Sequence, residues 1–74
     1  MVLSDEIKII RKKAFLSQTL FADEIQVSFS TVNRWENGKG KPNLTAMKSI
    51  KQFCEDHDIP YDNLEAAWFN SPSK

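Results

Sequence analysis

The 74-residue chain is poor in several residues on which particular classes of site depend. It has a single cysteine, Cys54, so no disulfide can form within the chain. Its two glycines, Gly38 and Gly40, are too few for a glycine-rich phosphate-binding loop, and no nucleophile elbow is present. No long apolar run occurs, and Met1 to Leu3 passes directly into polar residues, so we expect neither a signal peptide nor a membrane segment. These absences favour a cytoplasmic protein that is not an enzyme and has no membrane partner.

The only histidine, His57, follows Cys54 within an acidic run, which raises the question of a metal site. Cys54 is expected on the buried face of a helix, and His57 near the end of that helix. Ligands placed in this way do not converge on the tetrahedral geometry that zinc requires. We therefore expect a solvated helix end here, with neither a metal ion nor a cofactor.

The formal net charge is zero, but the charge is unevenly distributed. Residues 1–53 hold nine Lys or Arg against five Asp or Glu, whereas residues 54–74 hold one against five. A basic body can supply the phosphate contacts that dominate affinity for DNA, although such charges alone more often serve solubility. The DNA interpretation therefore depends on the motif that these charges flank. The candidate cations are Lys8, Arg11, Lys12, Lys13, Arg34, Lys39 and Lys41.

Residues 17–25 have the pattern of a short amphipathic helix. Ser17 is of the residue type that accepts hydrogen bonds from the free N–H groups at a helix start. It precedes Phe21, Ala22 and Ile25, whose spacing places them on one face of two helical turns.

A second short helix is predicted to begin at Ser28, again with a serine at its start. Val32 and Trp35 stand three residues apart on its inner face. It ends at Asn37 and Gly38, which tolerate the left-handed turn that closes a helix. Two short helices joined by a tight turn form a helix-turn-helix at residues 17–37. The outer face then carries a ring, a hydroxyl, an amide and a guanidinium, which match base edges and thymine methyl groups in a major groove: Phe29, Ser30, Asn33 and Arg34.

With these motifs in place, the chain resembles the Cro/Xre type, or lambda-repressor-like, family of helix-turn-helix DNA-binding proteins. The resemblance extends over about residues 4–64 without a gap. It rests on Leu16-Ser17-Gln18, Ala22, Val27-Ser28, Ser30-Thr31-Val32, Arg34-Trp35-Glu36-Asn37-Gly38, and then Lys39, Lys41 and Pro42. It implies an all-α, five-helix domain at residues 1–69, followed at 70–74 by a flexible tail or the start of a linker.

The resemblance also implies roles for individual residues. Gln18 matches a glutamine that clamps a phosphate and touches the recognition helix. Arg11 and Glu36 match a pair that ties the first helix to the end of the recognition helix. Asn33 can pair with adenine, and Arg34 with guanine or a phosphate. The implied base contacts are Ser28, Phe29, Ser30, Asn33 and Arg34, and the implied backbone contacts are Arg11, Gln18, Asn37, Gly38, Lys39 and Lys41.

Two residues depart from the family pattern. Gln26 stands in the turn where the family usually has glycine, and Phe15 stands where glycine usually precedes the leucine. We expect either residue to adopt a positive φ at some energetic cost. Phe15 is also a candidate to fill a gap between the first helix and the rest.

Three further helices are expected from apolar spacing. The first begins with a Ser4 cap, runs to about Lys13, and faces Leu3, Ile7, Ile10 and Ala14 inward. The fourth begins after Pro42-Asn43 and buries Leu44, Met47, Ile50 and Phe53 or Cys54. The fifth follows Ile59-Pro60 and carries Leu64, Ala67 and Trp68, with Trp68 packed inward and Phe69 the more exposed ring.

These observations predict a sequence-specific double-stranded DNA-binding protein that represses transcription as a homodimer on a palindromic operator. Phe69 is expected in the dimer contact. The alternative is a protein-interaction module of the same fold, antitoxin-like or a regulatory subunit, with Phe29 or Trp68 against a protein partner. A steep loss of DNA binding with salt distinguishes the first from the second.

Overall fold

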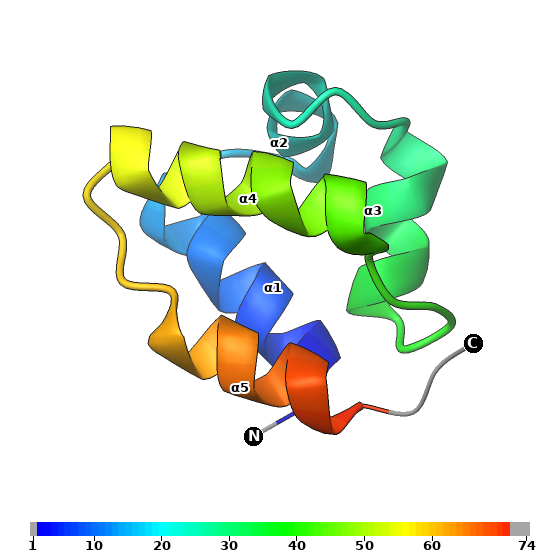
Figure 1. The fold of residues 1–74 in the computed structure, drawn as a ribbon. Helices are drawn as coiled ribbons and strands as arrows, with labels where there is room; N and C mark the ends of the chain where they lie inside the picture. The colour runs from blue at the N-terminus through cyan, green and yellow to red at the C-terminus, as the bar shows by residue number, and fades with distance from the viewer. Residues whose placement is uncertain (1, 72–74) are drawn as a thin grey trace.

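The computed structural model describes residues 2–71, which form five α-helices and, within this range, no strand. The predicted all-α class with five helices is confirmed. In Figure 1, α2 and α5 lie on opposite sides of the molecule. Helix α1 packs against both α3 and α5, and α2 packs against α3. The helices are α1 (Leu3–Lys13), α2 (Gln18–Glu24), α3 (Phe29–Glu36), α4 (Leu44–Asp56) and α5 (Asp62–Asn70).

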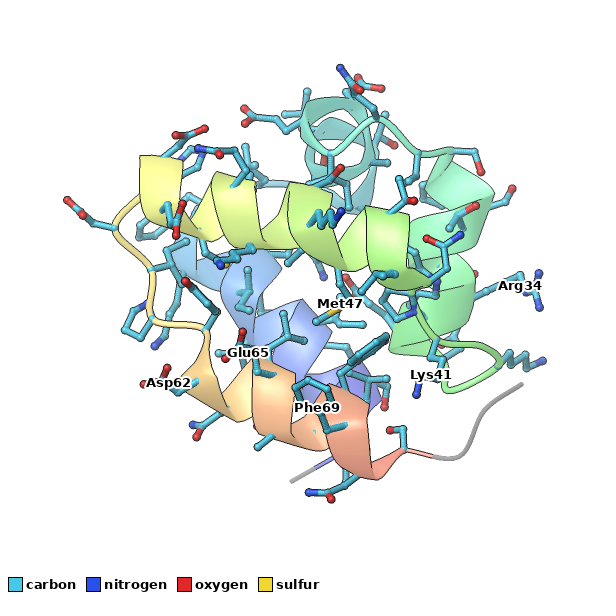
Figure 2. All side chains as sticks on the ribbon, in the orientation of Figure 1. Arg34, Lys41, Met47, Asp62, Glu65 and Phe69 are labelled. Atoms are coloured by element: carbon cyan, nitrogen blue, oxygen red, sulfur yellow. The ribbon has the colours of Figure 1, made fainter. Side chains whose placement is uncertain are left out.

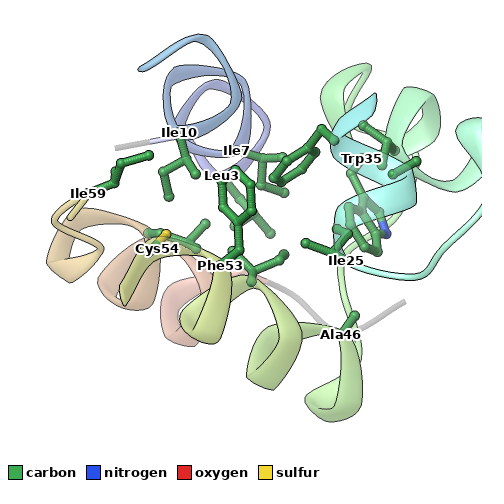
Figure 3. Packing of buried hydrophobic residues seen from close by; sticks show 14 of the residues in the cluster. Leu3, Ile7, Ile10, Ile25, Trp35, Ala46, Phe53, Cys54 and Ile59 are labelled. Atoms are coloured by element: carbon green, nitrogen blue, oxygen red, sulfur yellow. The ribbon is translucent and has the colours of Figure 1, made fainter. Parts of the chain in front are cut away.

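Apolar side chains from all five helices meet in one core (Figure 3). At its centre the rings of Phe21 and Phe53 contact edge to face, with 5.0 Å between centroids. Each fully buried side chain of this size stabilises the fold by roughly 1.5–3 kcal/mol, which matters greatly in so small a domain. The buried apolar residues are Leu3, Ile7, Ile10, Phe21, Ala22, Ile25, Val32, Trp35, Ala46, Ile50, Phe53, Cys54, Ile59, Leu64 and Ala67.

Three helices begin with side-chain caps, of which those at Ser17 and Ser28 were predicted. The side-chain oxygens of Ser17, Ser28 and Asn43 accept hydrogen bonds from the N–H groups of Leu20, Thr31 and Ala46, respectively. The prediction of a Ser4 cap is wrong. Helix α1 begins at Leu3, two residues earlier than a Ser4 cap implies, and its N-cap residue Val2 makes no side-chain cap bond. Burial of Leu3 in line with Ile7 and Ile10 extends the helix past the serine.

Helices α1 to α4 all end in the same backbone turn. One residue adopts a positive φ, and the N–H of the next residue bonds to the carbonyl five residues earlier, as in a Schellman motif. The residues of positive φ are Phe15 (59°), Gln26 (62°), Gly38 (74°) and Asp58 (56°). The N–H bonds run from Leu16 to Arg11, Val27 to Ala22, Lys39 to Arg34 and Ile59 to Cys54. The positive φ predicted for Phe15 and Gln26 is confirmed, and that of Asp58 was not foreseen.

Phe15 does not fill a gap in the core. Its side chain is 94% exposed, because the turn directs the following residue, Leu16, toward the core instead. The prediction that Leu44 is buried in α4 is also wrong, because this side chain is 63% exposed. It occupies the first position after the Asn43 cap, and the inward face of α4 instead starts at Ala46.

The two adjacent rings of α5 differ as predicted. Phe69 is 76% exposed, whereas Trp68 is half-buried and packs against the core. Helix α5 includes Asn70, and the Ser71 hydroxyl donates to the carbonyl of Ala67, so the start of the predicted tail is ordered. Residues 72–74 of that tail lie outside the described residues.

Candidate nucleic-acid interface

Helices α2 and α3 form the helix-turn-helix, and α3 presents one face to solvent. Val32 and Trp35 hold α3 to the core, with 0% and 6% of their surfaces exposed. On the opposite face Phe29, Ser30 and Arg34 are exposed, and Figure 2 shows Arg34 extending away from the body of the molecule. Ser28 is also exposed, but its hydroxyl is already engaged in capping α3 and in a hydrogen bond with Thr31.

Asn33 differs from its neighbours because it is half-buried and hydrogen-bonded. Its Nδ2 donates to Oε1 of Gln18 at 3.2 Å, and its Oδ1 accepts from Nδ2 of Asn37 at 3.1 Å. These two bonds use one of the two lone pairs on Oδ1 and one of the two hydrogens on Nδ2, so Asn33 keeps one acceptor site and one donor for a paired contact with adenine. Asn33 also carries part of the polar contact between α2 and α3.

Glu36 is the buried charge at the end of α3, with 2% of its side chain exposed. Arg11 contacts it at two points, from Nε at 2.7 Å and from Nη2 at 3.0 Å, and Gln18 Nε2 donates to it at 3.0 Å. A third donor of Arg11, Nη1, reaches the carbonyl of Leu16 at 2.9 Å. The hydrogen bond to Glu36 raises the pKa of the Arg11 guanidinium, against the opposing effect of burial.

These contacts form one polar network from α1 through α2 to the outer face of α3. Arg11 and Glu36, whose pairing the family resemblance implied, lie in direct contact. Gln18 connects the carboxylate of Glu36 to the amide of Asn33. A two-point pair buried to this degree is costly to break, because the surviving partner is left uncompensated. The network fixes where Gln18 and Asn33 stand relative to any ligand of α3.

The α3–α4 loop, residues 37–43, follows the recognition helix. Three of its N–H groups bond to carbonyls of α3. That of Asn37 bonds to Asn33 and Arg34, that of Gly38 to Trp35, and that of Lys39 to Arg34. The family resemblance implies that residues of this loop contact the DNA backbone. The three N–H groups are used to end the helix, whereas the side chains of Asn37 and Lys39 are exposed and remain candidates for that contact.

Lys41 is also placed differently from expectation. Its Nζ donates to the carbonyls of Trp68 at 3.0 Å and Ser71 at 3.2 Å, at the end of α5. Figure 2 shows Lys41 and Arg34 extending in different directions. Arg11 is similarly engaged by Glu36. Of the seven candidate cations, those with exposed side chains are Lys12, Lys13, Arg34 and Lys39.

The region around Cys54 has no features of a reactive site. The thiol is buried, and burial raises its pKa to about 11, so it stays protonated and a poor nucleophile at neutral pH. His57 instead contacts Glu24, with 3.3 Å between Nε2 and Oε1. Among residues 2–71 no three His, Cys, Asp or Glu side chains gather in a way that could hold a metal ion. Within the same range no helix is long and apolar enough to cross a membrane.

Comparison with known proteins agrees with this architecture. A family model described as "Helix-turn-helix" matches residues 7–55, which include all of α2, α3 and the loop that follows. The chain is also similar to the HTH-type transcriptional activator BcrR of Enterococcus faecalis, with 32% identity over 53 residues. That match covers 72% of this chain but only 26% of the relative. The chain thus belongs to the Cro/C1-type helix-turn-helix family.

Proposed function

We propose that this domain regulates transcription by binding specific sites on double-stranded DNA, with α3 in the major groove. The observation that carries the proposal is the outer face of α3, where Phe29, Ser30 and Arg34 are exposed on a helix held rigidly from its inner face. A guanidinium can pair with guanine, a hydroxyl with several base edges, and a ring with the thymine methyl group. Lys39 and the exposed lysines of α1 supply contacts to phosphate.

Selection of bound sequences from a random duplex pool tests this proposal. We expect a short shared site, and we expect Arg34→Ala to reduce discrimination against a scrambled site by roughly 1–3 kcal/mol. Asn33→Ala is expected to reduce discrimination by a similar amount. The substitution removes any base contact of Asn33 and also its hydrogen bond to Gln18. Asn63→Ala, an exposed amide on α5, is the matched control. An unchanged preference in both α3 variants would show that this face does not read bases.

We further propose a homodimer on a palindromic operator, formed through the groove between α4 and α5. Phe69 and Leu44 are exposed there by 76% and 63%, beside half-buried Met47 and Trp68. Two lysines of α4 and a glutamate of α5 also line this groove: Lys48, Lys51 and Glu65 (Figure 2 shows the neighbouring Met47, Glu65 and Phe69). A two-fold axis would set the lysines of one copy against the glutamate of the other.

Sedimentation of Phe69→Glu tests the dimer. We expect Phe69→Glu to abolish the dimer and weaken operator binding. Phe15 is an equally bulky exposed ring outside the groove, so Phe15→Glu is the control and should leave both unchanged. Unaltered sedimentation of Phe69→Glu would exclude dimerisation through α5.

We propose repression as the regulatory sign, because a domain bound across a promoter blocks transcription without any further contact surface. The similar protein of E. faecalis is named as an activator, and this chain corresponds to about a quarter of it, at 26%. Two reporter genes distinguish repression from activation, one with the selected site within the promoter and one with the site upstream of it. Repression only from within the promoter supports the proposal, and activation from upstream contradicts it.

The second candidate is a protein-binding module, favoured by the 48% exposure of Phe29. An apolar ring on α3 can bind a protein as well as a thymine methyl group. Titration with random duplex DNA at several salt concentrations distinguishes these functions, since phosphate contacts weaken steeply with salt. Binding that is absent at low salt would favour the protein-binding module.

A further inference from the structure

We propose that Lys41 and Trp68 are positioning residues that hold the α3–α4 loop in the shape in which it meets the DNA backbone. In this arrangement Lys41 is a cap on α5 rather than a phosphate ligand. The inference rests on the proposed DNA-binding function and adds a remote element to it. The anchor, defined as the side chains of Lys41 and Trp68 with their partners, joins residues 27 apart in the sequence.

The Lys41 ammonium is engaged at the end of α5 by two hydrogen bonds and one ring contact. It donates to the carbonyls of Trp68 and Ser71 at 3.0 and 3.2 Å, and it lies 4.7 Å from the centre of the Trp68 ring. Helix α5 has no basic residue in its own last turn, where the helix dipole favours a positive charge. Lys41 supplies that charge from another part of the chain, and the ring adds a cation–π contact.

Trp68 returns a hydrogen bond to the same loop. Its indole Nε1 donates to the carbonyl of Pro42 at 2.6 Å. Pro42 is almost fully buried, with less than 2% of its surface exposed. Trp68 therefore accepts a hydrogen bond from Lys41 at its backbone carbonyl and donates one from its side chain to the carbonyl of Pro42. Two consecutive loop residues are thus attached to one residue of α5.

The other side of the loop is attached to α3. The carbonyl of Lys39 accepts from Arg34 Nη2 at 3.2 Å, and the N–H of Lys39 bonds to the carbonyl of Arg34 at 2.9 Å. Only Gly40 separates this attachment from the anchor at Lys41. The position of the Lys39 side chain, a candidate phosphate contact, therefore depends on both Arg34 and α5.

A phosphate-binding role that drew the Lys41 ammonium away from α5 would break these contacts. Two hydrogen bonds to carbonyls and one ring contact would be lost together, and the last carbonyls of α5 would lose their charge partner. Lys39, which is exposed, has no such obstacle. The two lysines, two residues apart, are therefore expected to respond differently to the same substitution.

The first experiment uses the free protein and needs no DNA. Hydrogen exchange is measured at the Lys39 amide, which bonds to the carbonyl of Arg34, in Lys41→Met, Lys41→Arg and Trp68→Phe, and at the Trp68 indole in the two Lys41 variants. We expect exchange in the loop to accelerate about fivefold in Lys41→Met and Trp68→Phe, relative to core amides, because each loses one or more anchoring hydrogen bonds. Lys41→Arg keeps the charge and the donors, and should remain close to wild type. Unchanged loop exchange in Trp68→Phe, which keeps an aromatic ring, would overturn the anchor.

The second experiment measures affinity for the selected duplex at several salt concentrations. Lys39→Gln should reduce the slope of log affinity against log salt by about one, as expected for a lost phosphate contact. Lys41→Met should lower affinity about fivefold with an unchanged slope. Trp68→Phe, which changes no charge, should have the same effect. The double variant Lys41→Met/Trp68→Phe should lose no more than either single variant, because both act through one anchor.

The outcomes separate the two proposals. A slope reduced by about one in Lys41→Met would make Lys41 a phosphate ligand and overturn the positioning role. Wild-type affinity in Trp68→Phe would also overturn it. If wild-type protein binds no duplex at low salt, the proposed function fails, and the positioning role in DNA binding fails with it. The exchange measurements would then decide only whether α5 orders the loop.

Discussion

The end of the recognition helix differs from the ends of α1, α2 and α4, although all four share one backbone turn. After the turn, α1, α2 and α4 each place an apolar residue against the core: Leu16, Val27 and Ile59, respectively. At the same position after α3 stands Lys39, which is exposed. The residue of positive φ is also glycine only there, at Gly38.

The difference shows how a helix end can be fixed while its surface stays available. An apolar residue after the turn commonly accompanies this motif and buries the chain that follows. A buried residue after α3 would remove Lys39 from the surface that we propose meets DNA. Polar contacts replace it: Glu36 is held by Arg11 and Gln18, and Pro42 by Trp68. The end of the recognition helix is thus held in place by hydrogen bonds, where the ends of α1, α2 and α4 use apolar contacts.

The largest expected effect comes from breaking the polar attachment at Glu36. Glu36→Ala leaves the Arg11 guanidinium, with a side chain only 14% exposed, without its partner. We expect a loss of about 3–5 kcal/mol in the free energy of unfolding, measured by urea denaturation. Arg11→Ala should be similar, and the double variant should lose much less than the sum. Coupling near zero in this double-mutant cycle would mean that the pair does not stabilise the domain, and that polar contacts at Glu36 do not hold the end of α3.

The second effect tests the residue after the turn directly. Ile59→Ala removes a side chain that is only 7% exposed, and we expect a loss of roughly 2–5 kcal/mol. Lys39→Ala changes the equivalent residue after α3, and should stay within about 0.5 kcal/mol of wild type because it is exposed. Similar losses in the two variants, measured by thermal unfolding, would mean that the helix ends do not differ in the way described.

The features of these helices that the sequence predicted are those determined by residues nearby in the sequence. The caps at Ser17 and Ser28 depend on residues three positions away, and the inner face of α3 depends on Val32 and Trp35. The positive φ of Phe15 and Gln26 came from resemblance to a family that has glycine at those positions. Asp58 had no such guide, although an Asp followed by an apolar residue after a helix was present in the sequence.

The parts that were missed depend on how helices lie relative to each other. The bond from Trp68 to Pro42 joins residues 26 apart, and that from Lys41 to Trp68 joins residues 27 apart. No periodicity encodes either contact. Lys41 was read as one more cation beside Lys39, because its distance from the end of α5 appears only after folding. Leu44 was placed inward because apolar spacing alone did not show which turn of α4 first meets the core.

A smaller effect is expected at the glycine that sets α3 apart. Gly38 has a φ of +74°, and a Cβ there would meet no atom within 4 Å, so the cost of Gly38→Ala is conformational rather than steric. We expect a loss of about 1 kcal/mol in stability, the balance between left-handed strain and a less flexible unfolded chain. Gly40→Ala, at which no positive φ occurs, is the control and should change stability less. Equal effects of the two on thermal unfolding would contradict the role of Gly38.

The smallest effect, and the only gain, is expected from making the end of α1 resemble that of α3. Phe15 has a φ of 59° and is 94% exposed, so its ring contributes little packing while its backbone is strained. Phe15→Gly should relieve the strain, and the greater freedom of glycine in the unfolded chain should cancel part of this benefit. We expect a net gain of about 0.5 kcal/mol in urea denaturation. A loss of more than about 0.5 kcal/mol would show instead that the ring makes stabilising contacts at the junction of α1 and α2, and that exposure understates its packing.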